Sequence, residues 1–298
     1  MKKTTLLPLA ILLLASCSKS ESNEPDIPTP PEPRKTEIKI SAGMDNSRAT
    51  DYAFETGDQI GLYVVNNVNG AAGELAASGN HVDNMRYTYS GAWTPDTPIY
   101  WADDTTPADF YLYYPYTNVT SVTAMPFEVK SDQSDVAGYK SSELLIGKTA
   151  SVKPTESTVT ITAKHVLSRI NIVLQAGDGF TPESLAAANP AVRVNGTKTK
   201  ATVDLATATV TPEGDAAAVT PCYDNGVYKA LLIPQTVGMQ NLITITVNGK
   251  DYNLTKEFTF ESGKSHTFTC TVSKTSSGLN VNISAWETDG TDNGGVAE

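Results

Sequence analysis

Short runs in which apolar and polar residues alternate recur along most of the chain, separated by Gly, Asn, Asp and Pro. Alternation puts every second side chain on one face of an extended strand, so the pattern predicts strands that bury one face. Two-residue hairpin turns are predicted at Asn225-Gly226 and Asn248-Gly249. The one predicted helix has Thr181 as its N-cap and ends at Asn189-Pro190. The clearest apolar runs are 60–65, 110–114, 158–163, 168–174, 228–233, 242–247, 258–260 and 266–272.

The N-terminus follows a different pattern. Two lysines precede an apolar run over residues 6–14, which is shorter than the roughly 20 residues that a membrane-spanning helix needs. The run is typical of a signal peptide. It ends in Leu14-Ala15-Ser16-Cys17, which resembles a lipobox. We therefore expect residues 1–16 to be removed and Cys17 to carry lipid, which anchors the chain to a membrane.

Residues 17–35 are predicted to be a tether between the lipid and the folded body. Five prolines with Ser, Glu and Asn between them favour an extended polyproline geometry and leave little apolar surface to bury. Ser18 is not the aspartate that is associated with inner-membrane retention in enteric bacteria. On that analogy, we expect the chain to lie in the outer membrane with its body exposed at the cell surface.

The body is expected to be all-β, with two sandwich domains in tandem. Many short strands with regular turn signals are typical of β-sandwiches rather than of parallel sheets covered by helices. The stretch Lys153–Ser157 reads as a loop. We place the boundary there, between an N-terminal domain (36–156) and a C-terminal domain with a polar tail (157–298).

The composition excludes several classes of function. A net charge of −11 argues against nucleic-acid binding, which needs a basic face. The three histidines are far apart and lack a metal-ligand partner two or four residues away, so no metal or cofactor is expected. The usual motifs for a nucleophile or a phosphate loop are absent, so an enzyme is not expected. Cys222 and Cys270 could pair, or be two small buried residues in separate strands, which the size of the body favours.

Ten aromatic residues crowd into the stretch 87–116. Trp93, Trp101 and Tyr113 could belong to a platform on which a glycan or another host ligand stacks. The alternative is core packing, since aromatic residues are common in strands. Alternation over residues 110–114 places at least half of the aromatic side chains there on a buried face.

A lone amphipathic strand is predicted at each end of the body. A strand of this kind can be supplied by another molecule, because its removal leaves an apolar groove with unpaired backbone groups. It can equally be the first or last strand of one monomer. The two apolar faces are Ile38, Ile40 and Ala42 in strand 36–42, and Leu279, Val281 and Ile283 near the C-terminus.

Taken in order, the motifs of the chain resemble those of the fimbrillin family of Bacteroidota, lipoprotein precursors of type V pili that assemble by protease-triggered strand exchange. The shared motifs are the lipobox at Cys17, Asn46-Ser47-Arg48-Ala49-Thr50, the stretch 54–64, Tyr100-Trp101, the aromatic run 109–116, Glu143-Leu144-Leu145, the stretch 165–170, Leu231–Gln235 and Ile283 with Trp286.

This resemblance implies two tandem transthyretin-like β-sandwiches and a non-enzymatic structural role that supports adhesion. It also implies that an Arg-specific surface protease cuts between Arg48 and Ala49, which removes the lipid together with strand 36–42. A strand from another fimbrial subunit then fills the groove, and the subunit becomes part of a fimbrium. The donor would be residues 279–286 or the polar tail, and the polar, Gly-rich character of that tail also allows a tip subunit. The alternative is a permanently anchored surface lipoprotein, either an anchor subunit or an adhesin that binds a glycan or host ligand.

Overall fold

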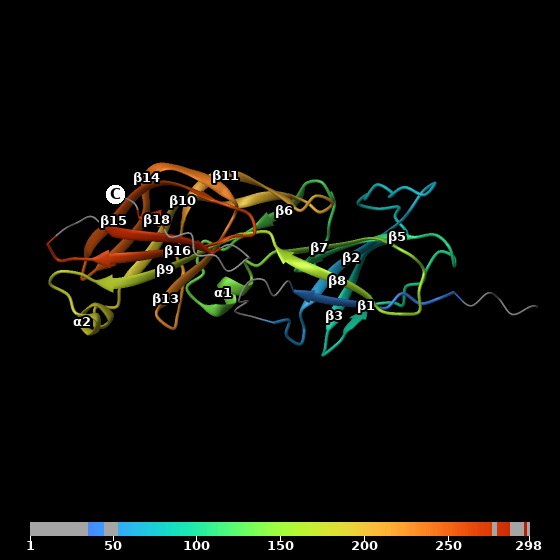
Figure 1. Cartoon of the computed structure of the whole chain (residues 1–298), viewed down its shortest axis with the longest axis horizontal. Helices are drawn as coiled ribbons and strands as arrows, with labels where there is room; N and C mark the ends of the chain where they lie inside the picture. Colours follow the sequence, from blue (N-terminus) through green and yellow to red (C-terminus); the bar gives the residue numbers. More distant parts are fainter. Residues whose placement is uncertain (1–34, 45–52, 276–278, 287–294, 297–298) are drawn as a thin grey trace, which may run out of the picture. The chain divides into compact units, whose positions relative to one another are not determined.

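The computed structural model describes residues 35–44, 53–275, 279–286 and 295–296, and this part of the chain is mostly β (Figure 1). It contains three sheets and two short helices, α1 (Val136–Lys140) and α2 (Pro182–Ala187). Neither helix has the length and hydropathy that a membrane-spanning helix requires. Residues 35–298 form one compact unit by their internal contacts.

The first sheet has seven strands in the order β1-β8-β7-β5-β2-β3-β4. β1 runs parallel to β8, and the other neighbours are antiparallel. The inner strands β2 and β5 are buried on both faces, which explains their nearly continuous apolar sequences. β1 is an edge strand. The bounds are β1 (Ile40–Met44), β2 (Gln59–Asn66), β3 (Val82–Tyr89), β4 (Trp93–Pro95), β5 (Ala108–Tyr114), β7 (Leu145–Val152) and β8 (Val159–His165).

Two further sheets face each other across a shared core. One has the order β11-β10-β14-β15, with β6 also paired to β10, and the other has the order β12-β13-β9-β16-β17-β18. Side chains from both sheets meet in a cluster that includes Ile172, Val194, Ile245 and Phe268, here called the C-terminal cluster. This is sandwich packing. The bounds are β6 (Met125–Glu128), β9 (Ser168–Ala176), β10 (Ala191–Asp204), β11 (Thr209–Val219), β12 (Cys222–Asp224), β13 (Val227–Leu232), β14 (Gln235–Val247), β15 (Lys250–Phe260), β16 (Ser265–Val272), β17 (Asn280–Trp286) and β18 (Gly295–Val296).

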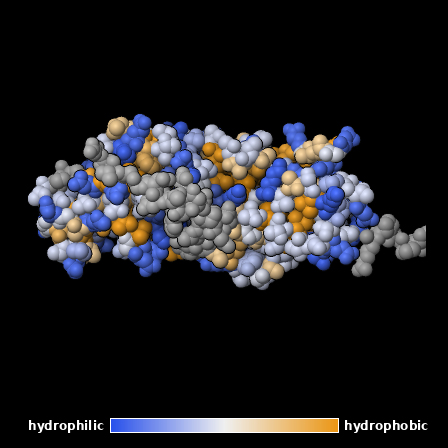
Figure 2. Space-filling model, in the orientation of Figure 1, coloured by the Kyte–Doolittle hydropathy of each residue, from blue (hydrophilic) through white to orange (hydrophobic). Residues whose placement is uncertain are grey.

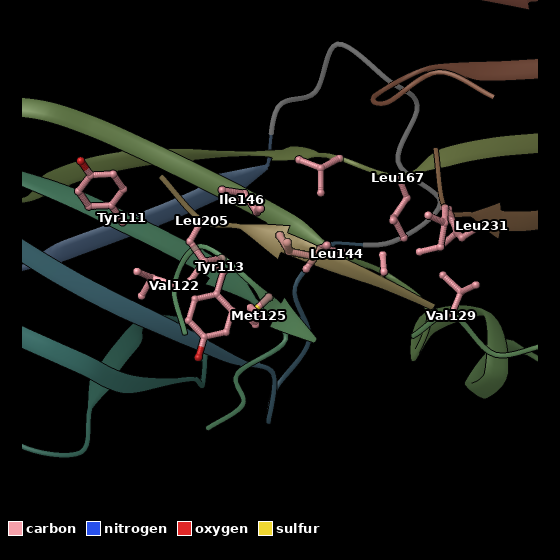
Figure 3. Close-up of a cluster of buried hydrophobic side chains, with 14 of the residues drawn as sticks. Tyr111, Tyr113, Val122, Met125, Val129, Leu144, Ile146, Leu167, Leu205 and Leu231 are labelled. Carbon is pink, nitrogen blue, oxygen red and sulfur yellow. The ribbon is translucent and has the colours of Figure 1, made fainter. Parts of the chain in front are cut away.

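A second cluster joins the two halves of the chain and is here called the linking cluster (Figure 3). It contains Tyr113 and Ile146 from the first sheet, Val203 from β10 and Leu231 from β13. β6 precedes β7 in the sequence but pairs with β10. The two halves are therefore interlocked through a shared core rather than joined by an exposed linker.

The change from the first sheet to the C-terminal sheets falls later than residue 157. β8 follows the boundary placed at 156/157, yet it pairs with β7 and β1 in the first sheet. The next strand, β9, belongs to the six-stranded sheet. The switch therefore lies at Val166-Leu167, and the loop-like stretch before β8 is a hairpin connection within one sheet.

The locally encoded predictions are confirmed. Asn225-Gly226 and Asn248-Gly249 all have positive φ angles and close the hairpins β12–β13 and β14–β15. The Thr181 side chain accepts a hydrogen bond from the Ser184 backbone at the start of α2. Cys222 and Cys270 are both buried and not joined by a disulfide. They lie in different clusters, so the prediction of two separate buried cysteines is also confirmed.

The face drawn in Figure 2 mixes hydrophilic and hydrophobic residues. The hydrophobic residues on this face form small patches with polar residues between them. The part of this face that is coloured therefore lacks the broad apolar surface that is typical of a protein–protein interface.

Candidate functional site

The segment that contains β1 pairs on two sides. At its start, the Ile38 amide donates to the Ile99 carbonyl at 2.8 Å, and the Trp101 amide donates to the Thr36 carbonyl at 2.9 Å. Further along, β1 pairs in parallel with β8, so that Ile40 lies opposite Val159. Removal of this segment would leave unpaired backbone groups on both neighbours.

One face of this segment is deeply buried. Ile38, Ile40 and Ala42 are 2%, 8% and 9% exposed, whereas Lys39 and Ser41 between them are exposed. The three buried side chains belong to a cluster here called the β1 cluster, which also includes Ile60, Leu62, Phe110 and Ile161. Burial of an isoleucine side chain contributes about 1.5–3 kcal/mol, so this apolar face is the main hydrophobic attachment of the segment.

Trp93 holds β1 from the opposite edge of the first sheet. Its indole Nε1–H donates to the Ala42 carbonyl at 3.0 Å. The ring is half-buried and packs edge-on against Phe54, with ring centroids 4.9 Å apart, and against Tyr89 at 5.1 Å. Trp93 lies in β4, the last strand of the sheet order, so this hydrogen bond connects the two edge strands. The contact gives Trp93 a structural role.

Trp101 and Tyr113 are not available as a ligand platform. Trp101 is 2% exposed, and its indole N–H donates to the Thr155 carbonyl at 3.1 Å. Tyr113 is 1% exposed, and its hydroxyl lies 2.6 Å from Asn84 Oδ1. Burial raises the pKa of Tyr113 well above its ordinary value. Because protein covers both rings, the interpretation of Trp101 and Tyr113 as sugar-stacking residues is wrong.

The last amphipathic strand lies in the sheet of its own subunit. β17 pairs antiparallel with β16, and the short strand β18 pairs with β17. Leu279, Val281 and Ile283 are half-buried and pack against the C-terminal cluster. These side chains therefore complete the core of this chain in the structure described here.

The predicted lipidation and cleavage residues lie outside the described residues. Cys17 falls within 1–34, and Arg48 and Ala49 fall within 45–52. In the sequence, Arg48 stands in the connection from β1, which ends at Met44, to β2.

Polar groups that could suggest catalysis are structural in this chain. Glu55 and Asp58 form a turn in which the Glu55 amide donates to Asp58 Oδ2 at 2.7 Å, and Gly57 has a φ of 101°. His165 Nδ1 lies 3.0 Å from Glu143 Oε1. Burial raises the pKa of the Cys270 thiol to about 12, which keeps it protonated and unreactive. Within the described ranges, no three acidic, His or Cys side chains are placed to hold a metal ion.

Two features had no signal in the sequence. The bond from Trp93 to Ala42 joins residues 51 positions apart, and no local pattern predicts it. The second is a cavity beside α2, lined in part by Tyr223 and Tyr228. Both depend on how the strands are arranged in space.

The chain is similar in sequence and in fold to proteins of Bacteroides. It is 27% identical over 309 residues to a protein of Bacteroides uniformis named "Putative fimbrium subunit Fim1C", with 96% of each chain covered. It is 28% identical over 167 residues to a protein of Bacteroides ovatus named "Putative fimbrium tip subunit Fim1C". The matched region covers 49% of this chain and 30% of the Bacteroides ovatus protein. The crystal structure of a "putative cell adhesion protein" from Bacteroides uniformis has a similar fold, with a TM-score of 0.67 and 23% identity over 85% of this chain and 99% of the other.

The sequence model of the fimbrillin-like family matches residues 47–286, which is most of the chain. This family consists of structural and adhesion proteins rather than enzymes. The order of the motifs, the mostly β architecture and this match agree with one another. The chain belongs to the fimbrillin-like family.

Proposed function

We propose that this protein is a shaft or tip subunit of a cell-surface fimbria and supports adhesion together with other fimbrial subunits. The family and the name of the Bacteroides uniformis relative support this role. In this proposal the chain is exported as a lipoprotein and reaches the outer membrane through lipid on Cys17. Its two halves act as tandem transthyretin-like sandwiches, the first of which includes β8.

Assembly begins in this proposal when an Arg-specific protease cuts between Arg48 and Ala49. The cut releases the lipid anchor and the segment that contains β1. The observation that carries the proposal is the position of β1: it is an edge strand whose apolar face covers the β1 cluster, and in the sequence it lies directly before Arg48. An edge strand can leave without breaking the pairing between the strands that remain.

The vacated groove then accepts a strand from another subunit. The incoming strand must repeat the spacing of Ile38, Ile40 and Ala42, because a shift by one residue would turn polar side chains towards the core. Residues 279–286 have this alternation. β17 occupies its own sheet, so it must first leave β16 to act as a donor. A subunit in which β17 stays in place would accept a strand without donating one, which is the behaviour of a tip.

Limited proteolysis tests this proposal. The chain from Ser18, which carries no lipid, should be cut after Arg48 by an Arg-specific protease and should then form oligomers on size-exclusion chromatography. Arg48→Ala should remain monomeric. Arg34→Ala is the matched control, because Arg34 precedes β1 and its loss should leave assembly unchanged. Oligomers of Arg48→Ala in the same yield as those of the unaltered chain would contradict strand release.

The alternative of permanent anchoring makes a different prediction. Mass spectrometry of the N-terminus on intact cells should find Ala49 as the first residue if the subunit is processed. A lipid-modified Cys17 on the surface-exposed chain would instead identify an anchored lipoprotein. The burial of Trp101 and Tyr113 argues against an anchored adhesin that binds its ligand through these two rings.

A further inference from the structure

An open cavity of about 480 Å³ lies beside α2 in the C-terminal half of the chain. Its walls are the end of β9, helix α2, the residues Asn189 and Pro190 shortly after that helix, and the β12–β13 hairpin. Figure 1 shows where α2, β9 and β13 lie in the chain. The volume is in the range of about 300–1,000 Å³ that is usual for small-molecule sites. We propose that this cavity binds a neutral saccharide, with Tyr223 as the ring on which the sugar stacks.

The aromatic wall is preformed. The rings of Tyr223 and Tyr228 have centroids 4.7 Å apart. The Tyr228 hydroxyl donates to the Pro190 carbonyl at 2.9 Å, which ties the hairpin to the segment after α2. Tyr223 rests on this fixed neighbour and is itself 58% exposed. A large aromatic side chain held in the open beside a cavity is suited to contact with a ligand, because ring stacking needs a free face.

The polar groups of the cavity suit hydroxyl groups. The side chains of Gln175 and Asn189 are exposed at the rim, and neither makes a side-chain hydrogen bond to another described residue. A primary amide offers both donors and an acceptor, and so does each pair of neighbouring sugar hydroxyls. The tight end of α2 fixes the position of Asn189, which has a φ of 47° and donates its amide to the Ala186 carbonyl at 3.0 Å.

The lining also decides the charge of the ligand. No acidic or basic side chain is present among the lining residues, so a phosphate, a carboxylate or a cation would have no countercharge there. A sugar has an apolar ring face and a rim of neutral hydroxyls, which match the tyrosine and the amides. The lining residues are Leu174, Gln175, Ala176, Pro182, Leu185, Ala186, Asn189, Pro190, Tyr223, Gly226 and Tyr228.

A glycan array tests the proposal. The probe set should contain neutral oligosaccharides of glucose, mannose, galactose and N-acetylglucosamine beside sialylated and sulfated glycans, and a proline-rich peptide should be measured in parallel. The chain from Ser18 should bind one or more of the neutral glycans. Tyr223→Ala should weaken that binding about tenfold or more, and Tyr223→Phe should retain it because the ring remains. Tyr100→Ala is the matched control, since Tyr100 is an exposed tyrosine, 43% accessible, that does not line the cavity.

Each outcome decides the question. Binding of a neutral glycan that is lost in Tyr223→Ala and kept in Tyr100→Ala establishes the site. An array without a neutral ligand overturns the proposal, as does binding that is equal in the two alanine variants. Binding of the proline-rich peptide alone overturns it as well and identifies a peptide groove. The proposal does not rest on strand exchange, because the cavity is made by β9, α2 and the β12–β13 hairpin.

Discussion

The hydrogen bond from Trp93 to β1 leads to a sharp prediction. Trp93→Phe keeps an aromatic ring against Phe54 and Tyr89 but removes the indole N–H that donates to the Ala42 carbonyl at 3.0 Å. Because Trp93 lies on β4, the loss removes a bond between the two edges of the first sheet without touching the pairing of β1 with β8. We expect β1 to open more often while the remaining strands of the sheet stay paired.

The magnitude follows from the geometry. A hydrogen bond of ordinary length between neutral groups contributes about 0.5–1.5 kcal/mol net. The Trp93 ring is only half-buried, so the smaller ring of phenylalanine adds little to the cost. The free energy of opening β1 should therefore fall by about 1 kcal/mol, which corresponds to roughly fivefold faster amide exchange at the residues of β1.

Hydrogen exchange followed by NMR measures this effect directly. The amides of Ile40–Met44 should exchange faster in Trp93→Phe, whereas those of β16, in the six-stranded sheet, should keep their rates and serve as the internal reference. Unchanged exchange in β1 would refute the role assigned to the indole. An equal acceleration in β16 would also refute it, because the substitution would then lower global rather than local stability.

Two further substitutions test contacts made by Leu231 and Tyr113, which both belong to the linking cluster. Gln133→Ala should lower the free energy of unfolding by about 2 kcal/mol or more in urea titrations. The reason is that the buried Gln133 side chain accepts a hydrogen bond from the Leu231 amide at 2.9 Å and donates one to the Leu231 carbonyl at 2.8 Å. An unchanged midpoint of urea unfolding would contradict this. Gly61→Ala would place a Cβ 2.1 Å from the buried ring of Tyr113, so thermal melts should show a loss of about 1–3 kcal/mol in the free energy of unfolding. Gly43→Ala is the control and should be nearly neutral, because a Cβ there would meet no atom within 4 Å. Equal effects of the two substitutions would refute the packing argument.

Signals that act over a few residues were readable from the sequence. The turns at 225–226 and 248–249 depend on positive φ angles that Asn and Gly adopt readily, and the start of α2 depends on one capping side chain. The alternation in segment 36–42 gave the correct buried face, because β1 is covered on one side only. In each case the physical cause lies within the segment itself.

The aromatic region shows where such reasoning stops. The prediction from alternation assumes that one face of the strand is exposed to solvent, but β5 is buried on both faces. Phe110 and Leu112 point into the β1 cluster, and Tyr111 and Tyr113 point into the linking cluster. The alternation of side chains along β5 therefore could not separate core residues from ligand-binding residues. The boundary near residue 157 has a related ambiguity, because a hairpin within one sheet and a connection between two sheets have the same loop composition. In the structure, this stretch connects β7 and β8 of the same sheet.

The same two-sided burial of β2 and β5 supports the proposal that β1 is the strand of the first sheet that is exchanged. β2 and β5 each serve two clusters, so removal of either would open both cores. The segment that contains β1 serves one cluster, and its two isoleucines, Ile38 and Ile40, account for about 3–6 kcal/mol at 1.5–3 kcal/mol each. That is a large share of the roughly 5–15 kcal/mol that holds an ordinary domain together. In the proposed assembly, a subunit that has lost β1 should therefore keep the pairing of its other strands while remaining only marginally stable, and the lost stability would favour rapid capture of a strand from a neighbour.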